Sequence, residues 1–348
     1  MHQHTAIGID LAKRVFQVCV VDTRHPGVRV NKELKRRELL DFMRHQPACR
    51  VYLEACAGAH YWARQFNALG HETKLMAPQF VTPFRKGHKT DANDALAIVE
   101  AGLRPTMRFV PRKGLAQQDL QSLHRVRERL IKQRTQLINQ THGLLQEYGI
   151  IAGRGQKALK QVLAQALEDA ENELTMAMRA LLAEQREELN RLNARLAELD
   201  QRVRQQAQAL PPCRALQAIE GIGPIGATLL VAALGDGHVF ANGRQAAAYL
   251  GLTPRQYSSG GKVTLIGIGR TGHPQLKATL IRGAHAVIKT LGDKPDPKSQ
   301  WLRALVARAG ANKAAVALAN KTVRTAWAVL HHGTDYRRDY EHPRATAA

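Results

Sequence analysis

The sequence is poor in acidic residues. Its 348 residues include 29 Asp and Glu against 51 Lys and Arg, which leaves a formal net charge of +22. Such an excess attracts polyanions at long range and releases counterions when a phosphate backbone binds. The charge therefore indicates a nucleic acid partner. By itself it does not separate DNA from RNA or from an anionic membrane surface, and a generic basic protein stays open at this point.

Other features are missing. No run approaches the roughly 18 apolar residues that cross a bilayer, and the first residues lack the pattern of a secretory signal. The histidines show no H-x-x-x-H spacing for zinc, and there is no G-x-x-x-x-G-K-[ST] loop for ATP. Aromatic residues make up only 5% of the chain, too few for base stacking to dominate binding. The four cysteines are scattered, so we expect reduced thiols in a cytoplasmic protein: Cys19, Cys49, Cys56 and Cys213.

The N-terminal part, residues 1–110, alternates strand-like and helix-like patterns. This alternation predicts a mixed α/β sheet domain. The expected strands are residues 5–10, 15–22, 28–30, 50–54 and 72–76, and the expected helices are residues 37–45 and 61–69.

Residues 111–210 have the leucine spacing of long amphipathic helices. One run is Leu120, Leu123, Val126, Leu130, Leu137, Leu144 and Leu145, and the other is Leu189, Leu192, Leu196, Leu199 and Val203. We predict a coiled-coil helical hairpin that turns at Gly149–Gly155. The hairpin serves either as a dimerisation or nucleic-acid-binding arm, or as helices packed on their own domain.

Residues 211–333 begin with Pro211-Pro212, a linker signal, and are predicted to form a mainly helical domain. Residues 241–290 hold seven cations and no Asp or Glu, the strongest local basic bias in the chain. The remaining residues, 334–348, are predicted to be a disordered tail.

Four carboxylates form the first candidate site. Asp10 and Glu54 end two apolar strand-like runs, and Asp91 and Asp94 open a probable helix, where a spacing of three places both on one face. Buried strand ends do not carry charge unless it is paired or metal-bound. Converging carboxylates of this kind hold the two Mg²⁺ ions that clamp a phosphodiester. Taken singly, each acid is equally typical of a charge at a helix terminus or on the surface.

The second candidate is the segment from Gly251 to Lys262. It places Ser258 and Ser259 before two glycines, among cations that suit a flexible phosphate-binding loop. No histidine lies nearby in sequence to act as a base. The residues alone therefore favour a loop that grips phosphate without a covalent role.

The third candidate is Gly221-Ile222-Gly223-Pro224 ahead of an apolar helix. A turn of this type offers backbone N–H groups to a DNA phosphate, as in helix-hairpin-helix modules, or it is a plain tight turn. The residues that we expect to contact nucleic acid are Lys89, Gly221, Gly223, Arg255, Lys262, Arg270 and Lys277.

In this order, these motifs resemble the DEDD transposases of insertion sequence family one hundred and ten, the bridge-RNA-guided recombinases. The resemblance rests on the segments that begin at Ile7, Leu53, Lys89, Gly221, Tyr249 and Ser258. It implies a RuvC-like, RNase-H-type N-terminal domain that holds Mg²⁺ with Asp10, Glu54, Asp91 and Asp94. The chain departs from the family at Arg270, where a lysine is common.

The resemblance also implies a serine nucleophile in the C-terminal domain, carried here by Ser259 with Ser258 as the alternative. It implies donor and target DNA as substrates, a non-coding bridge RNA as guide, and a dimer that assembles into a tetramer, with the acidic site and the serine supplied by different subunits. Two other hypotheses remain: a RuvC-like junction resolvase that uses metal-activated water, and a non-enzymatic nucleic-acid-binding scaffold.

Overall fold

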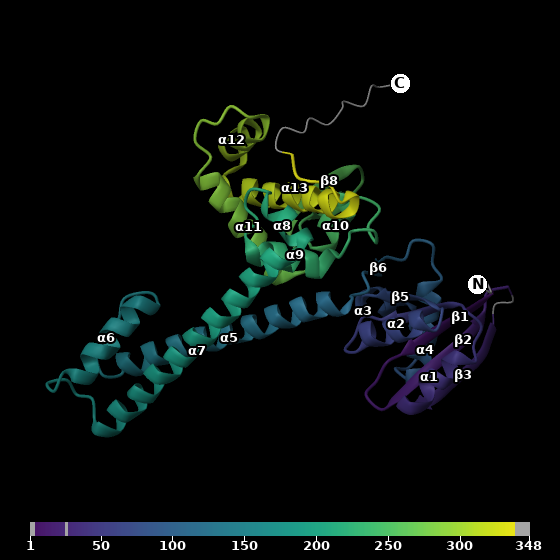
Figure 1. Ribbon diagram of the computed structural model, residues 1–348, viewed down its shortest axis with the longest axis horizontal. Helices are drawn as coiled ribbons and strands as arrows, with labels where there is room; N and C mark the ends of the chain where they lie inside the picture. The colour runs from purple at the N-terminus through teal and green to yellow at the C-terminus, as the bar shows by residue number, and fades with distance from the viewer. Residues whose placement is uncertain (1–3, 25–26, 338–348) are drawn as a thin grey trace. The chain divides into compact units, whose positions relative to one another are not determined.

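The computed structural model describes residues 4–24 and 27–337, which fall into two compact units. The described residues up to Gln117, together with His238–Ala241, form the N-terminal unit. Gln118–Gly237 and the described residues from Asn242 onward form the helical unit (Figure 1). A mixed α/β N-terminal part and a mostly helical remainder confirm the predicted fold class, whereas the finer boundaries at residues 110, 210 and 333 stay predictions.

The N-terminal unit is built on a mixed sheet with the strand order β3-β2-β1-β4-β5-β6. Strands β1, β2 and β3 pair antiparallel, β4 and β5 run parallel to β1, and β6 pairs antiparallel to β5. All five predicted strands are confirmed, and β6 was missed because two residues carry no periodicity. The strands are β1 (Thr5–Asp10), β2 (Val15–Asp22), β3 (Gly27–Lys35), β4 (Arg50–Glu54), β5 (Glu72–Met76) and β6 (Phe109–Val110).

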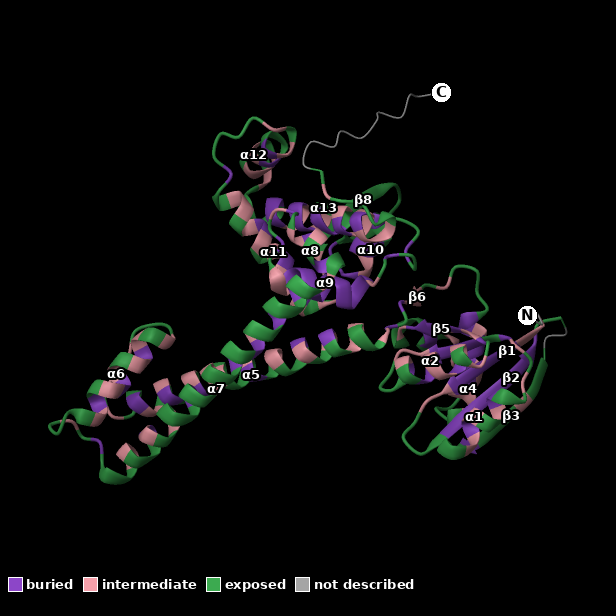
Figure 2. Ribbon diagram, viewed as in Figure 1, coloured by how far each residue is buried: buried purple, intermediate pink, exposed green. Residues whose placement is uncertain are grey.

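Helices cover both faces of this sheet. Because side chains alternate along a strand, Ile7 and Ile9 enter one core with α1 and α2, while Ala6 enters a second core with α4. The central strands are drawn as buried in Figure 2. The helices of this unit are α1 (Arg36–Arg44), α2 (Ala59–Ala68), α3 (Pro78–Val81), the 3-10 turn Thr82–Phe84 and α4 (Asp91–Gly102).

Helix α4 lies against β1 at unusually short range, and Gly8 permits it. A Cβ on Gly8 would stand 2.5 Å from the carbonyl oxygen of Ala95 and 2.8 Å from the backbone nitrogen of Val99. The C-terminal end of α4 also packs closely on the sheet, because a Cβ on Gly102 would overlap the ring of Tyr52. Small residues at both ends therefore set how closely α4 approaches the sheet.

The helical arm differs from its prediction at the turn. The two long helices, α5 (Leu115–Gln146) and α7 (Met176–Ala209), pack antiparallel, but α6 (Gln156–Glu168) lies between them in the chain. Gly149–Gly155 thus joins α5 to α6 and is not the turn of a simple hairpin. The apolar residues of α6 supply a separate core at this end, with Leu159 and Leu163 packed on Leu145.

Polar contacts along α5 and α7 follow the antiparallel pairing. Arg127 donates to Asp200 over 2.5 Å, and Arg134 donates to Asn193 over 3.3 Å. The two contacts are seven residues apart on each helix and follow each other in opposite directions along α5 and α7, which establishes the antiparallel pairing, while the coiled coil stays a prediction.

The rest of the helical unit gathers around apolar α9 and α13. The prediction of a linker at Pro211-Pro212 was wrong: both prolines open α8, and only Leu210 separates α8 from α7. Proline suits this place because the first turn of a helix needs no backbone donor there. The helices are α8 (Pro211–Gln217), α9 (Pro224–Leu234), α10 (Gly243–Tyr249), α11 (Pro274–Lys289), α12 (Pro297–Ala309) and α13 (Ala311–His332).

The serine segment is a β-hairpin and not a flexible loop. Strands β7 (Pro254–Ser259) and β8 (Lys262–Ile268) pair antiparallel, and Ser259 stands opposite Lys262. Gly260 and Gly261 make the turn with φ of 53° and 77°. A two-residue turn with both φ values positive matches strand twist, which explains the pair of glycines.

Among the described residues, no helix has the length and apolarity needed to cross a membrane. The four cysteines are free thiols, as predicted. Residues 334–337 form no helix or strand, and the rest of the predicted tail, 338–348, lies outside the described residues.

Replacing Gly8 with alanine is expected to lower the free energy of unfolding by about 1–3 kcal/mol, because the new methyl group forces α4 away from β1. Gly267→Ala is the matched control: this glycine also lies in a strand, and a Cβ there meets nothing within 4 Å. Urea unfolding followed by circular dichroism measures both. Equal stability of the two variants would contradict the steric account of Gly8.

Candidate active site

Two of the four predicted carboxylates leave the sheet at the same edge. Strands β1 and β4 are parallel, and their register pairs Ile9 with Leu53. The next residue of each strand, Asp10 and Glu54, therefore lies at the carboxyl end of the two strands. Both are half-buried and on the face that α4 covers, since they follow Gly8 and Tyr52 by two residues.

The other two carboxylates stand in the first turn of α4. Thr90 caps this helix: its hydroxyl accepts a hydrogen bond from the backbone N–H of Asn93 at 3.3 Å. The side-chain amide of Asn93 donates to the carbonyl oxygen of His88 at 2.8 Å, and this hydrogen bond holds the preceding loop against the helix. Acidic side chains are favourable at a helix N-terminus, so Asp91 and Asp94 also support the start of α4.

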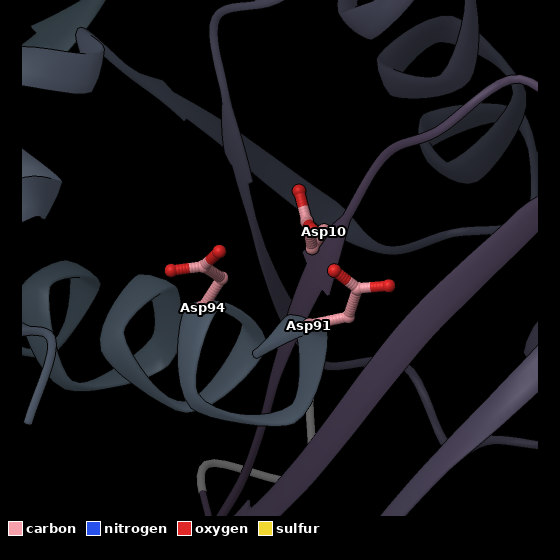
Figure 3. Close-up of side chains that lie close together, drawn as sticks. All are labelled: Asp10, Asp91 and Asp94. Atoms are coloured by element: carbon pink, nitrogen blue, oxygen red, sulfur yellow. The ribbon is translucent and has the colours of Figure 1, made fainter. Parts of the chain in front are cut away.

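The structure brings three of the predicted residues directly together. One carboxylate oxygen from each of Asp10, Asp91 and Asp94 lies within 4.8 Å of the others (Figure 3). Glu54 is outside this trio but close enough for the charges of Asp10 and Asp94 to raise its pKa. The structure therefore brings three of the four acids together and places Glu54 near them.

Burial and mutual repulsion shape the electrostatics of this cluster. Burial raises the pKa of Asp10, and the charges of Asp94 and Asp91 raise it further. Burial also raises the pKa of Glu54, with repulsion from Asp10 and Asp94 acting in the same direction. The cluster therefore holds negative charge at a cost, and a bound cation would remove that cost.

Two cations partly offset the repulsion. Arg85 pairs with Asp94, with 3.3 Å between the guanidinium nitrogen and the carboxylate oxygen. Lys89, predicted to contact nucleic acid, is exposed and lowers the pKa of both Asp10 and Glu54 by its charge. Arg85 was not singled out from the sequence, because an arginine nine residues before Asp94 in a loop carries no signal of its own.

The predicted serines lie in the helical unit, on opposite faces of the β7–β8 hairpin. Ser259 alternates with Tyr257 and Arg255 on β7, and its cross-strand partner is Lys262. Ser258 pairs with Val263 on the other face, where its hydroxyl accepts a hydrogen bond from the Gln256 amide at 2.6 Å.

Every residue of β7 is exposed, and so is nearly all of β8. The hairpin thus offers Ser259 to solvent beside basic side chains.

The stem of the hairpin is held by Lys277 of α11. Its ammonium group donates to the carbonyl oxygens of Gly269 at 2.7 Å and Thr271 at 2.8 Å, and burial lowers its pKa. Gly251 and Gly272 complete the packing, because a Cβ on either would overlap neighbouring backbone. Lys277 is only 7% exposed, so its side chain supports the loop that contains exposed Arg270.

The glycine turn before α9 packs closely on α11. Gly221 has φ of 88°, and a Cβ on Gly283 would overlap the Gly221 carbonyl group. Gly221 and Gly223 are both exposed, and Gly223 precedes the first residue of α9. The close contact requires a residue without a side chain at Gly283, the positive φ favours glycine at Gly221, and the turn stays at the surface.

Comparison with known families matches both parts of the chain. A DEDD transposase model of the IS110 family matches residues 7–150, and the model described as "Transposase IS116/IS110/IS902 family" matches residues 213–302. The chain belongs to the IS110 family of transposases. The first match contains the four carboxylates and the second contains the serine hairpin.

Relatives of similar length support this membership. A probable family 20 transposase of Pseudomonas aeruginosa is 48% identical over 95% of this chain and 98% of its own length. The transposase of insertion sequence element IS1111A from Coxiella burnetii is 40% identical over 95% of this chain and 91% of its own. The transposase of element IS1328 from Yersinia enterocolitica is 37% identical over 96% and 99%.

Transposases of this family are enzymes that catalyse DNA cleavage and strand transfer by phosphoryl transfer. The DEDD class indicates use of a divalent metal, and the residues present fit such an ion. Asp10, Asp91 and Asp94 offer three hard oxygen ligands within reach of one cation. Burial and repulsion between the acids raise the pKa of Asp10 and Glu54 although Lys89 lowers both, so a bound cation would favour the charged form of each carboxylate.

Asp10→Asn is expected to stabilise the transposase in EDTA, and more so at higher pH. The folded pKa of Asp10 lies above its ordinary value of 3.8. Between those two values the folded chain therefore holds more protons than the unfolded chain, and its stability falls as pH rises. Thermal unfolding at pH 4 and pH 7 should show a gain for the variant of roughly 1–3 °C at pH 7 only. Asp119→Asn, at an exposed position of α5, is the control, and an equal gain at both pH values would contradict the prediction.

Proposed function

We propose that this transposase cleaves and rejoins DNA with two chemical parts, metal-bound carboxylates and a serine nucleophile, under the guidance of a structured RNA. The observation that supports the proposal most directly is the convergence of Asp10, Asp91 and Asp94 beside Glu54. The mixed sheet of the unit that contains these residues is consistent with a DEDD nuclease-like domain, and we infer a RuvC-like fold of the RNase H type.

In this proposal Asp10, Glu54, Asp91 and Asp94 hold Mg²⁺. When bound, the metal would neutralise the non-bridging oxygens of the scissile phosphate and the charge that builds on them. The carboxylates fix the place of that phosphate, because two come from strand ends and two from a capped helix turn. Arg85 holds Asp94 in its orientation, and Lys89 extends positive charge from the site toward the DNA backbone.

Ser259 is proposed as the nucleophile. Its oxygen forms a bond to phosphorus as the bond from phosphorus to the leaving sugar oxygen breaks; the serine gives up its proton to solvent, and the leaving oxygen takes one up. The product is a phosphoserine ester, which conserves the bond energy for a later strand exchange without ATP. A hydroxyl of the incoming strand then reverses the step and releases the serine.

The hairpin geometry supports Ser259 over Ser258. Ser259 shares its face with Arg255 and stands opposite Lys262, so an attacked phosphate would meet two cations. Ser258 shares its face with Gln256, which already donates to its hydroxyl, and stands opposite apolar Val263. The exposed position of the whole hairpin suits a group that must reach into a DNA substrate.

Further partners complete the proposal. Arg255, Lys262 and Arg270 contact nucleic acid, the exposed α9 N-terminus with Gly221 and Gly223 faces a DNA phosphate, and Lys277 acts by holding the loop. A bridge RNA pairs with donor and target DNA, which accounts for a net charge of +22 on a chain of 348 residues. The α5–α7 arm joins protomers into a dimer and then a tetramer in the cytoplasm.

Ser259→Ala is expected to abolish a covalent protein–DNA adduct that the wild-type transposase forms with its element DNA. Ser258→Ala is the matched control and should keep the adduct, which denaturing gel electrophoresis with labelled DNA detects. Wild-type transposase in EDTA, and Asp10→Asn in Mg²⁺, should lose cleavage while still binding DNA. If Ser259→Ala cleaves DNA without an adduct, the enzyme is a hydrolytic nuclease that uses metal-activated water. If the wild type binds DNA without cleaving it, and neither EDTA nor Asp10→Asn changes that binding, the chain is a binding scaffold.

RNA that co-purifies with the transposase, expressed together with its flanking element DNA, is expected to contain one discrete structured species encoded beside the gene. Sequencing of the bound RNA measures this. The control is the same chain expressed without the flanking DNA, which should carry only heterogeneous cellular RNA. The same heterogeneous mixture in both preparations would contradict a guide RNA.

A further inference from the structure

A buried amide lies next to Asp10 on the sheet. Gln17 is the direct antiparallel partner of Asp10 in the β1–β2 register, and it is only 7% exposed. A buried amide needs hydrogen-bond partners, because leaving its donors unpaired costs free energy. Gln17 donates from its side-chain nitrogen to the side-chain oxygen of Asn31 on β3 at 2.6 Å.

Asn31 also forms a hydrogen bond to helix α4. Its side-chain nitrogen donates to the backbone carbonyl oxygen of Ala92 at 3.1 Å. A carbonyl oxygen only accepts, so Asn31 must turn its NH₂ group toward Ala92, and its own oxygen is then left for Gln17. The two hydrogen bonds therefore define one direction along the chain from Gln17 through Asn31 to Ala92.

These two hydrogen bonds, from Gln17 to Asn31 and from Asn31 to Ala92, are called the relay below. The relay ends at the part of α4 that carries the acidic site. Ala92 lies between Asp91 and Asp94 in the first turn. Without a cation, the negative charges of these acids and of Asp10 repel one another. Packing at Gly8 holds α4 one turn further along, at Ala95. The relay adds a second attachment, from edge strand β3 to the first turn itself.

We propose that Gln17 and Asn31 are positioning residues that set the distance between the first turn of α4 and Asp10, and so the affinity of the acidic site for a divalent cation. This inference rests on the proposed metal site. Neither side chain needs to touch the metal: Gln17 orients Asn31, and Asn31 holds the backbone between two ligands. Removing such outer partners characteristically weakens metal binding because the ligands lose their preset geometry.

The test is a cycle of variants on the full-length transposase with Mn²⁺ as the probe. Asn31→Ala removes both hydrogen bonds, and Gln17→Met removes the first at similar side-chain volume. Isothermal titration calorimetry and the Mn²⁺-dependent rise in unfolding temperature should show a half-saturating concentration about tenfold higher for Asn31→Ala. Gln17→Met should raise it by a smaller factor. The double variant should have the same half-saturating concentration as Asn31→Ala, because Asn31→Ala alone already removes both hydrogen bonds of the relay.

Three readouts separate positioning from a general loss of stability. DNA affinity in EDTA should not change, cleavage should recover at high Mn²⁺, and Asn139→Ala, an exposed asparagine on α5, should behave as wild type. If Gln17→Met does not fold, Asn31→Ser on the edge strand carries the test. Unchanged half-saturation, or factors that simply multiply in the double variant, would overturn the relay. Absence of saturable Mn²⁺ binding by the wild type would overturn the metal site and the relay together.

Discussion

The close contact between α4 and β1 is the constraint on which the acidic site depends. Gly8 has no side chain where a strand of this sheet would ordinarily carry one, and Ala95 and Val99 occupy that space. The helix therefore starts beside the end of the strand, and its first two acids meet Asp10. Three like charges at this distance repel, so backbone packing has to hold them together, and a bound cation would offset their repulsion.

The serine hairpin is built differently from the acidic site. The carboxylates are half-buried on rigid elements, whereas the serines lie on a two-stranded hairpin that is exposed on both faces. Such a hairpin is marginal on its own. Here its stem is tied down by Lys277, which binds two backbone carbonyl groups. A firm stem with an exposed tip is compatible with the nucleophile that we propose for Ser259.

Much of the N-terminal sheet and of the acidic site is predictable from the sequence. Strands β1, β2, β4 and β5 are apolar runs of ordinary length, so their periodicity located them, and acids that interrupt such runs mark a site. Other features carry no local signal. Helix α6 resembles either of its long neighbours in composition, and Pro211-Pro212 indicates a break as readily as a helix start. Gly260-Gly261 indicates flexibility until strand pairing makes it a tight turn.

Composition and short-range order are enough to give the excess of positive charge, the strands with their terminal acids, and the motifs that identify an IS110-family transposase. Other features exist only in the folded chain. There Asp91 and Asp94 meet Asp10 with Glu54 beside them, Ser258 and Ser259 lie on opposite faces of the hairpin, and Gln17 is linked to α4 through Asn31. Strand register and helix packing decide such meetings, and both depend on contacts between residues far apart in the chain.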